Sequence, residues 1–181
     1  MASELYVETL KGLTSGANAN KVIIPSGQEL IAPGHVIGFY DHSWNTGQIL
    51  TSTSYADITG SEFTYTPKSD NSTLFLMYNL HTYMEATTGA NNGFSLKLLV
   101  DSSEVNPPSQ SYEHYNNFTG INWEWYTRAA RLGSFTNTST ATKTIKLQGR
   151  VYYSGGGDRL ITNNGSGNSF YSSIIVQEIA G

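Results

Sequence analysis

Hydrophobic and polar residues alternate along most of this 181-residue chain, with the two-residue period of β-strands that are buried on one face. The alternation is clearest over residues 144–153, where the apolar side chains are those of Ile145, Leu147, Val151 and Tyr153. The next residues, 154–158, include three consecutive glycines, which favour a tight hairpin because glycine readily adopts a positive φ. The C-terminal region therefore predicts antiparallel strands.

Residues 74–80 and 172–179 predict strands that are apolar on both faces. One face of these strands carries Leu74, Leu76, Tyr78, Leu80, Ile174 and Val176. The opposite face carries Phe75, Met77, Ile175 and Ile179. We expect the second set to contact an identical subunit in a homo-oligomer, since a lone sandwich would expose it to water. The second sheet and the loop 105–126 are alternative partners for this face.

Eight or nine short apolar runs after residue 35, separated by Gly, Asn, Ser and Pro, predict an all-β antiparallel sandwich of the jelly-roll kind. The single plausible helical turn spans residues 126–132. Residues 1–34 differ, because two of their three short strands end in proline and a turn. We expect residues 1–34 to be an N-terminal attachment segment and residues 35–181 to be the sandwich head. The alternative is that residues 1–34 form an edge of the same sandwich.

Composition narrows the classes of partner. Charged residues make up only 13% of the chain and the net charge is −4, with no basic stripe, which argues against nucleic acid. The absence of cysteine excludes disulfides and thiolate metal sites. No apolar run is long enough for a membrane span, so we expect no membrane insertion. The N-terminus lacks a secretory signal, so we expect synthesis and assembly in the cytoplasm.

Several short motifs occur in a characteristic order along the chain. They are KVIIPSG at 21–27, TSTSYADI at 51–58, YTPKS at 65–69, SLKLLVD at 95–101 and the ending IIVQEIA at 174–180. In this order the chain resembles the C-terminal domains of bacteriophage tail-fibre and virion appendage or decoration proteins, especially those of marine and cyanobacterial phages. The resemblance implies a trimeric jelly-roll-like head on the surface of the virion, assembled in the host cytoplasm, with no enzymatic residues. The segment 105–126 departs from that pattern.

The segment 105–126 is rich in aromatic residues beside Asn, His and Glu. Its candidate glycan-binding side chains are Tyr112, Tyr115, Trp123, Trp125 and Tyr126. Aromatic rings stack on sugars while amides and carboxylates bind the hydroxyls, so a host-glycan site is one interpretation. The alternative is that these rings pack in the core or in a subunit interface, where Tyr and Trp are also enriched.

The sequence contains few residue patterns that are typical of a metal site or a catalytic site. The four histidines, His35, His42, His81 and His114, occur singly and lack the close spacing of zinc ligands, so we expect neither a metal nor a cofactor. A polysaccharide depolymerase would need paired carboxylates, for which the candidates are Glu85, Glu113, Glu124 and Asp158. We expect a non-enzymatic homotrimeric virion protein that contacts other virion proteins through residues 1–34. A receptor-binding tip and a depolymerase are the alternatives, in that order.

Overall fold

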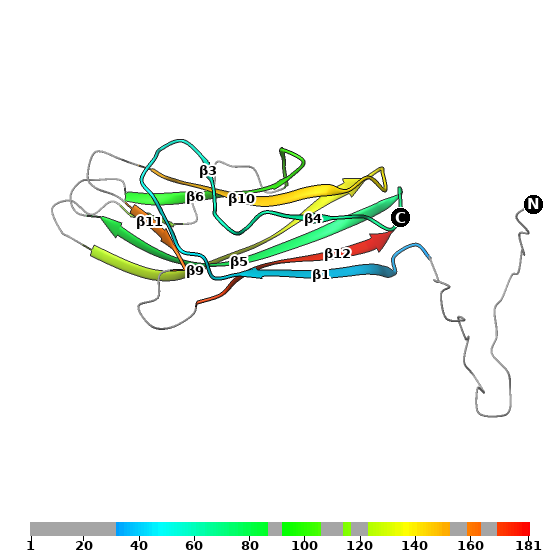
Figure 1. The fold of residues 1–181 in the computed structure, drawn as a ribbon, viewed down its shortest axis with the longest axis horizontal. Coiled ribbons are helices and arrows are strands. Elements are labelled where there is room, and N and C mark those ends of the chain that lie inside the picture. The colour runs from blue at the N-terminus through cyan, green and yellow to red at the C-terminus, as the bar shows by residue number, and fades with distance from the viewer. Residues whose placement is uncertain (1–31, 87–91, 106–113, 117–122, 153–158, 164–169) are drawn as a thin grey trace, which may run out of the picture. The chain divides into compact units, whose positions relative to one another are not determined.

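A computed structural model of the chain describes residues 32–86, 92–105, 114–116, 123–152, 159–163 and 170–181, and every regular element in these ranges is a β-strand (Figure 1). The chain divides into two units between Ile31 and Ala32, and the first unit lies outside the described residues. The predicted attachment segment, residues 1–34, thus falls almost wholly outside the described part, as does the predicted glycine hairpin at 154–158.

Twelve strands occur in the described ranges. They are β1 (Val36–Trp44), β2 (Gln48–Leu50), β3 (Ala56–Asp57), β4 (Phe63–Tyr65), β5 (Ser72–Ala86), β6 (Asn92–Val100), β7 (Ser103–Glu104), β8 (His114–Asn116), β9 (Trp123–Asn137), β10 (Lys143–Val151), β11 (Arg159–Thr162) and β12 (Ser172–Ala180).

The strands form two antiparallel sheets that lie face to face as a sandwich (Figure 1). The first sheet has the order β1-β12-β5-β11-β2, with β9 also paired to β5. The second sheet has the order β3-β10-β6-β7, with β4 also paired to β10 and β8 to β6. Every strand pair is antiparallel. The predicted all-β antiparallel sandwich is confirmed.

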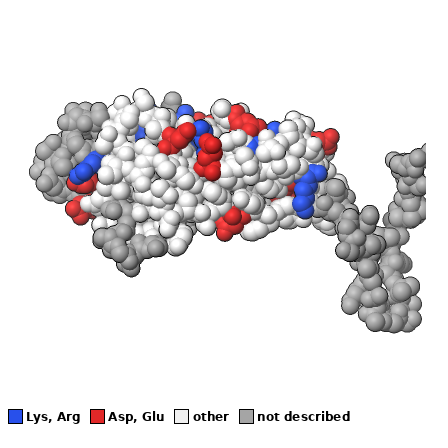
Figure 2. Space-filling view, viewed as in Figure 1, with Lys and Arg blue, Asp and Glu red and all other residues white. Residues whose placement is uncertain are grey.

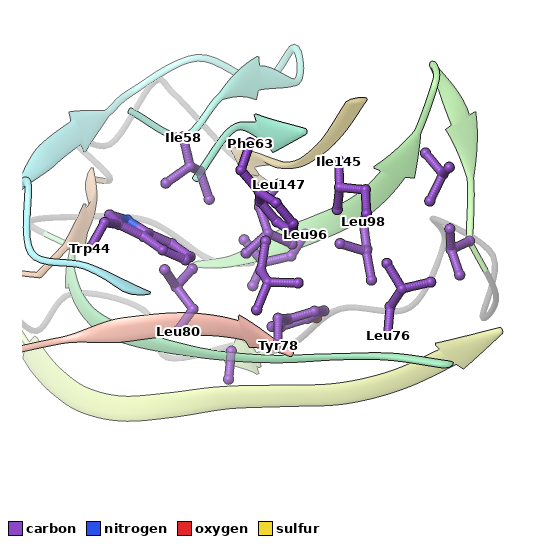
Figure 3. Close-up of a cluster of buried hydrophobic side chains, with 14 of the residues drawn as sticks. Trp44, Ile58, Phe63, Leu76, Tyr78, Leu80, Leu96, Leu98, Ile145 and Leu147 are labelled. Atoms are coloured by element: carbon purple, nitrogen blue, oxygen red, sulfur yellow. The ribbon is translucent and has the colours of Figure 1, made fainter. Parts of the chain in front are cut away.

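The core fills the space between the sheets, and the predicted alternation supplies it (Figure 3). From the first sheet come Leu74, Leu76, Tyr78 and Leu80, and from the second come Leu96, Leu98, Ile145 and Leu147. A methyl group at Gly149 of β10 would lie 2.9 Å from Leu50 and 3.3 Å from Leu96. Glycine at this position therefore lets side chains of both sheets approach the β10 backbone closely.

Residues 126–132, predicted as a helical turn, lie instead within the fifteen-residue strand β9. All fifteen residues of β9 pair with β5, from Trp123 opposite Ala86 to Asn137 opposite Ser72. The local preference of Thr-Arg-Ala-Ala-Arg-Leu for helix is overridden by this pairing, since strand formation depends mainly on the neighbouring strand and on burial. The prediction of a helical turn was therefore wrong.

The described body has two distinct ends. At one end, the backbone N–H of Gly34 donates to the carbonyl of Ala180 at 2.8 Å, and that of Gly181 donates to the carbonyl of Asn71 at 2.8 Å. The start of the body and its C-terminus therefore lie at the same end. At the opposite end, β5 finishes and β9 begins, with Ala86 paired to Trp123. Strands of fifteen residues separate the two ends.

Candidate functional site

Five of the hydrophobic side chains on the outer face of the first sheet form a group that we call the apolar face: Phe39, Phe75, Met77, Leu132 and Ile175. Cross-strand pairing places them together, because Ile175 lies opposite Met77 and Met77 lies opposite Leu132. Phe39 pairs with Gln177, which pairs with Phe75. Phe39 is 62% exposed, Leu132 60%, Met77 44% and Phe75 38%.

The four residues predicted to form a subunit contact, Phe75, Met77, Ile175 and Ile179, all project to this outer face. Their neighbours in sequence, such as Leu76 and Val176, point into the core. Sequence analysis missed Phe39 and Leu132. Phe39 could have been found, because it lies an odd number of residues before buried Trp44 and so has the outward parity of the two-residue period of β1. Leu132 was concealed by the helical interpretation of residues 126–132.

The outer face of the second sheet has the opposite character. Lys146 lies 2.7 Å from the Asp57 carboxylate and 3.7 Å from that of Glu62, and Lys97 lies 3.5 Å from Glu104. The hydrogen bond from Lys146, followed by one from Gln148, lowers the pKa of Asp57. Figure 2 shows acidic and basic side chains gathered over this layer. The outer face of the second sheet is therefore charged, whereas the apolar face of the first sheet exposes hydrophobic side chains to water.

Of the five predicted glycan-binding residues, only Trp125 and Tyr126 have side chains that the structure describes. Tyr112 lies outside the described residues, and the side chains of Tyr115 and Trp123 are not described. Trp125 and Tyr126 are adjacent on β9, where successive side chains point to opposite faces. Trp125 pairs with buried Met84, whereas Tyr126 packs on Tyr83 of the outer face, with ring centroids 4.5 Å apart.

Polar groups surround the Tyr83–Tyr126 pair on the outer face. Glu124 pairs with Glu85 and Arg128 with His81 across β9 and β5. Burial, followed by the hydrogen bond and charge of Glu124, raises the pKa of Tyr83 to about 12. The outer face thus changes along the first sheet, from the apolar face to an aromatic and polar region at the end where β9 begins.

Two of the four predicted carboxylates come together in the structure. Glu85 and Glu124 lie directly opposite each other on the outer face, while Glu113 and Asp158 lie outside the described residues. Arg159 donates a 2.6 Å hydrogen bond to Glu85, which holds that carboxylate in an ion pair. Glu85 is therefore held in an ion pair with Arg159, whereas Glu124 is hydrogen-bonded to Tyr83.

His81 is 7% exposed, and its ring stacks on Phe170 with centroids 3.9 Å apart and planes 10° apart. Its backbone N–H donates to the hydroxyl of Ser172 at 2.9 Å. Burial, followed by the charge of Arg128, lowers the pKa of His81. This histidine joins the segment before β12 to β5 and is kept in the neutral form.

Glu178 is fully buried between the sheets, although sequence analysis assigned it no role. Its carboxylate accepts hydrogen bonds from Tyr65, from the backbone N–H groups of Lys68 and Ser69, and from the Ser72 hydroxyl, at 2.8–3.0 Å. The sequence could have indicated this burial, because Glu178 follows Ile174 and Val176 at the two-residue spacing of the buried side chains of β12. All these donors come from the chain itself, so the carboxylate joins β12 to the segment 65–72.

Small-molecule and metal sites have little support in the described ranges. No group of three or more His, Asp or Glu side chains able to hold a metal ion occurs there. A cavity of about 10 Å³ between the sheets, lined in part by Tyr78, Leu98 and Arg131, has room for one water molecule at most. The described part of the chain contains no helix that is long and apolar enough to cross a membrane.

No family model and no curated protein matches the chain. Among solved structures, a similar chain is the one described as the crystal structure of dimeric latent PorU from Porphyromonas gingivalis. The match has a TM-score of 0.35 and 10% identity, and it covers 90% of this chain and 15% of that chain. A similarity at this level carries no inference about function.

Proposed function

We propose that this chain is a non-enzymatic structural protein of a bacteriophage particle, a surface appendage that assembles as a homotrimer through the apolar face. The observation that carries the assembly is the contrast between the two outer faces of the sandwich. The assignment to a virion rests on the order of sequence motifs that resembles phage tail-fibre and decoration proteins.

A second copy of the chain is the occupant that fits the apolar face best. Full burial of a Leu, Met or Phe side chain contributes about 1.5–3 kcal/mol, so covering five partly exposed side chains contributes roughly 5 kcal/mol or more. Each copy presents the same face, and three copies can turn it toward a shared threefold axis. The ion-paired outer face of the second sheet is left in water, where its charges stay solvated.

The direction of the appendage follows from the two ends of the body. Residue 34, where the attachment segment would join, lies at the same end as Gly181. The other end carries Trp125 and Tyr126 and would face away from the particle. Antibody against the chain should label intact phage particles, and variants lacking residues 1–34 should remain folded but fail to join them. Labelling of the cell fraction alone would contradict the proposal.

A receptor-binding tip is the second candidate, and the Tyr83–Tyr126 pair beside Glu124 and Arg128 is the observation that favours it. Host glycan binding would then be lost in Tyr126→Ala and kept in Trp125→Ala, because the two side chains lie on opposite faces of β9. A depolymerase would instead release reducing ends from host polysaccharide. Release that Glu124→Gln abolishes would contradict the non-enzymatic proposal.

A further inference from the structure

A row of apolar and aromatic side chains crosses the outer face of the first sheet at the end where β9 begins. We call it the transverse row: Ile49 of β2, Ile161 of β11, Tyr83 of β5 and Tyr126 of β9. Ile49 lies opposite Ile161, which lies opposite Tyr83, and Tyr83 lies opposite Tyr126. Three strand spacings make the row about 14 Å long. Both of its ends reach solvent, because Ile49 is 55% exposed and Tyr126 is 60% exposed.

The two sides of the transverse row differ in charge. On one side Glu85 lies opposite Glu124, and both acids are held within the chain. Glu85 accepts a 2.6 Å hydrogen bond from Arg159, and Glu124 is hydrogen-bonded to Tyr83. On the other side Arg128 lies opposite His81. A chain of groups that lies along the row therefore meets acids on one side and a guanidinium on the other.

Arg128 is exposed, and no acid of the described chain forms an ion pair with it. Its Nη1 donates to the Asn79 side chain at 3.4 Å. Its charge still acts on its neighbour, because burial, followed by the charge of Arg128, lowers the pKa of His81. Four other cations of the described part are paired with an Asp or Glu at 2.6–3.5 Å: Lys97, Lys143, Lys146 and Arg159. Arg128 is therefore available to bind an anionic group that a ligand brings.

The spacing of Tyr126 and Arg128 fits a sugar that carries a carboxylate. The two residues are two positions apart on one face of β9, so their Cα atoms lie about 7 Å apart. An exposed aromatic ring can stack on the apolar side of a sugar ring. A guanidinium can form two parallel hydrogen bonds with a carboxylate, which is planar like itself. One acidic sugar can therefore contact both side chains at once.

We propose that the transverse row binds a polysaccharide that contains carboxylated sugars, with one sugar ring stacked on Tyr126 and its carboxylate bound by Arg128. The inference rests on the second candidate function, the receptor-binding tip, and names the chemistry of its ligand. Repulsion by Glu124 on the opposite side of the row orients the acidic sugar, because like charges repel each other. The neighbouring sugars lie along the row toward Ile49. Neither Tyr126 nor Arg128 belongs to the apolar face.

Oligosaccharides that differ only in charge test the proposal. The probes are oligomers of galacturonic, glucuronic, mannuronic and N-acetylneuraminic acid, each beside its methyl ester, which has the same sugar rings without the charge. Titration calorimetry with the full chain should show at least one acid that binds about tenfold or more tightly than its ester, because the ester cannot form the charge-assisted bond to Arg128. Equal affinity for acids and esters, or no binding of any probe, would overturn the proposal.

Variants then locate the bound acid. Arg128→Gln and Tyr126→Ala should each weaken its binding about tenfold or more, because each removes one of the two contacts. Arg128→Lys should keep part of the affinity, since lysine retains the charge but not the planar fork. Lys146→Gln is the matched control, because it removes the same charge from the outer face of the second sheet. Its affinity should stay within about twofold of the wild type, since solvent screens a charge on the opposite face.

Two further outcomes separate this inference from the functions proposed above. An equal loss of affinity in Lys146→Gln and Arg128→Gln would show attraction by overall charge and would overturn the site. Binding of the neutral esters that Tyr126→Ala abolishes and Arg128→Gln leaves unchanged would overturn the acidic ligand, while the receptor-binding tip would stand. Circular dichroism and the solution mass of every variant should equal those of the wild type, so the proposed trimer is tested separately.

Discussion

The hydroxyl of Tyr65 donates a 2.8 Å hydrogen bond to the buried carboxylate of Glu178, and this bond joins β4 of the second sheet to β12 of the first. A methyl group at Gly38 of β1 would collide with that hydroxyl, so glycine leaves the space that the bond needs. The same carboxylate binds the backbone of Lys68 and Ser69. The Glu178 carboxylate thus joins the two sheets by hydrogen bonds at the end of the body where residue 34 lies.

Replacing Tyr65 with Phe should lower the free energy of unfolding by about 1.5–3 kcal/mol, because the substitution removes a hydrogen-bond donor from a buried charge. Urea denaturation monitored by tryptophan fluorescence measures the change. Tyr40→Phe is the control, since the Tyr40 ring stacks on Phe63 and is 41% exposed. We expect that variant to stay within about 0.5 kcal/mol of the wild type. An equal loss in both variants would contradict the role of the Tyr65 hydroxyl.

Acid should destabilise the sandwich through Glu178. Burial alone would raise the pKa of this carboxyl, but the backbone N–H of Lys68, the Tyr65 hydroxyl, the Ser69 N–H and the Ser72 hydroxyl together lower it. The unfolded chain therefore binds a proton more readily than the folded chain, so the contribution of Glu178 is present above about pH 4 and is lost as the pH falls through the folded-state pKa. Unfolding curves between pH 7 and pH 2 should show this loss, and Glu178→Gln should flatten it.

Protonation of His81 should also destabilise the fold, in a pH range above that in which Glu178 is protonated. Burial, followed by the charge of Arg128, lowers the pKa of this imidazole, so the neutral form is favoured in the folded state. The resulting stability is present above the ordinary histidine range and is lost as the pH falls below about 6.5. Unfolding free energies measured between pH 8 and pH 5 should decline in the wild type. His81→Asn should be less stable at pH 8 and show a smaller decline.

The two-residue alternation was enough to predict the fold class, because burial of one strand face is the main determinant of a sandwich. It placed Ile145 and Leu147 in the core and separated Phe75 and Met77 from the inward face of β5. The same two-residue period, continued along β12, would have shown that Glu178 is buried. Counted back from Trp44 along β1, it would have placed Phe39 on the outer face. Those two residues could therefore have been predicted from the sequence.

Other features depended on tertiary pairing. The Ala129–Ala130 pair with its flanking arginines favours helix locally, and only the partner strand β5 shows that β9 is continuous. The density of aromatic residues in 112–126 suggested one binding groove, yet Trp125 and Tyr126 diverge because β9 runs through both. The ion pairs of Lys146 with Asp57 and Glu62 join residues far apart in sequence and carry no local signal.

Identical subunits that cover the apolar face of one another give a larger particle than the single chain, so the solution mass of the purified chain shows whether they assemble. Light scattering should give about 60 kDa, three times 19.8 kDa, for the wild type and for Thr144→Lys on the outer face of the second sheet. Met77→Lys should give about 20 kDa with unchanged circular dichroism, since a charge cannot be buried in the contact without a large cost. A folded wild-type chain near 20 kDa, or a Met77→Lys variant with the wild-type mass, would contradict trimerisation through the apolar face.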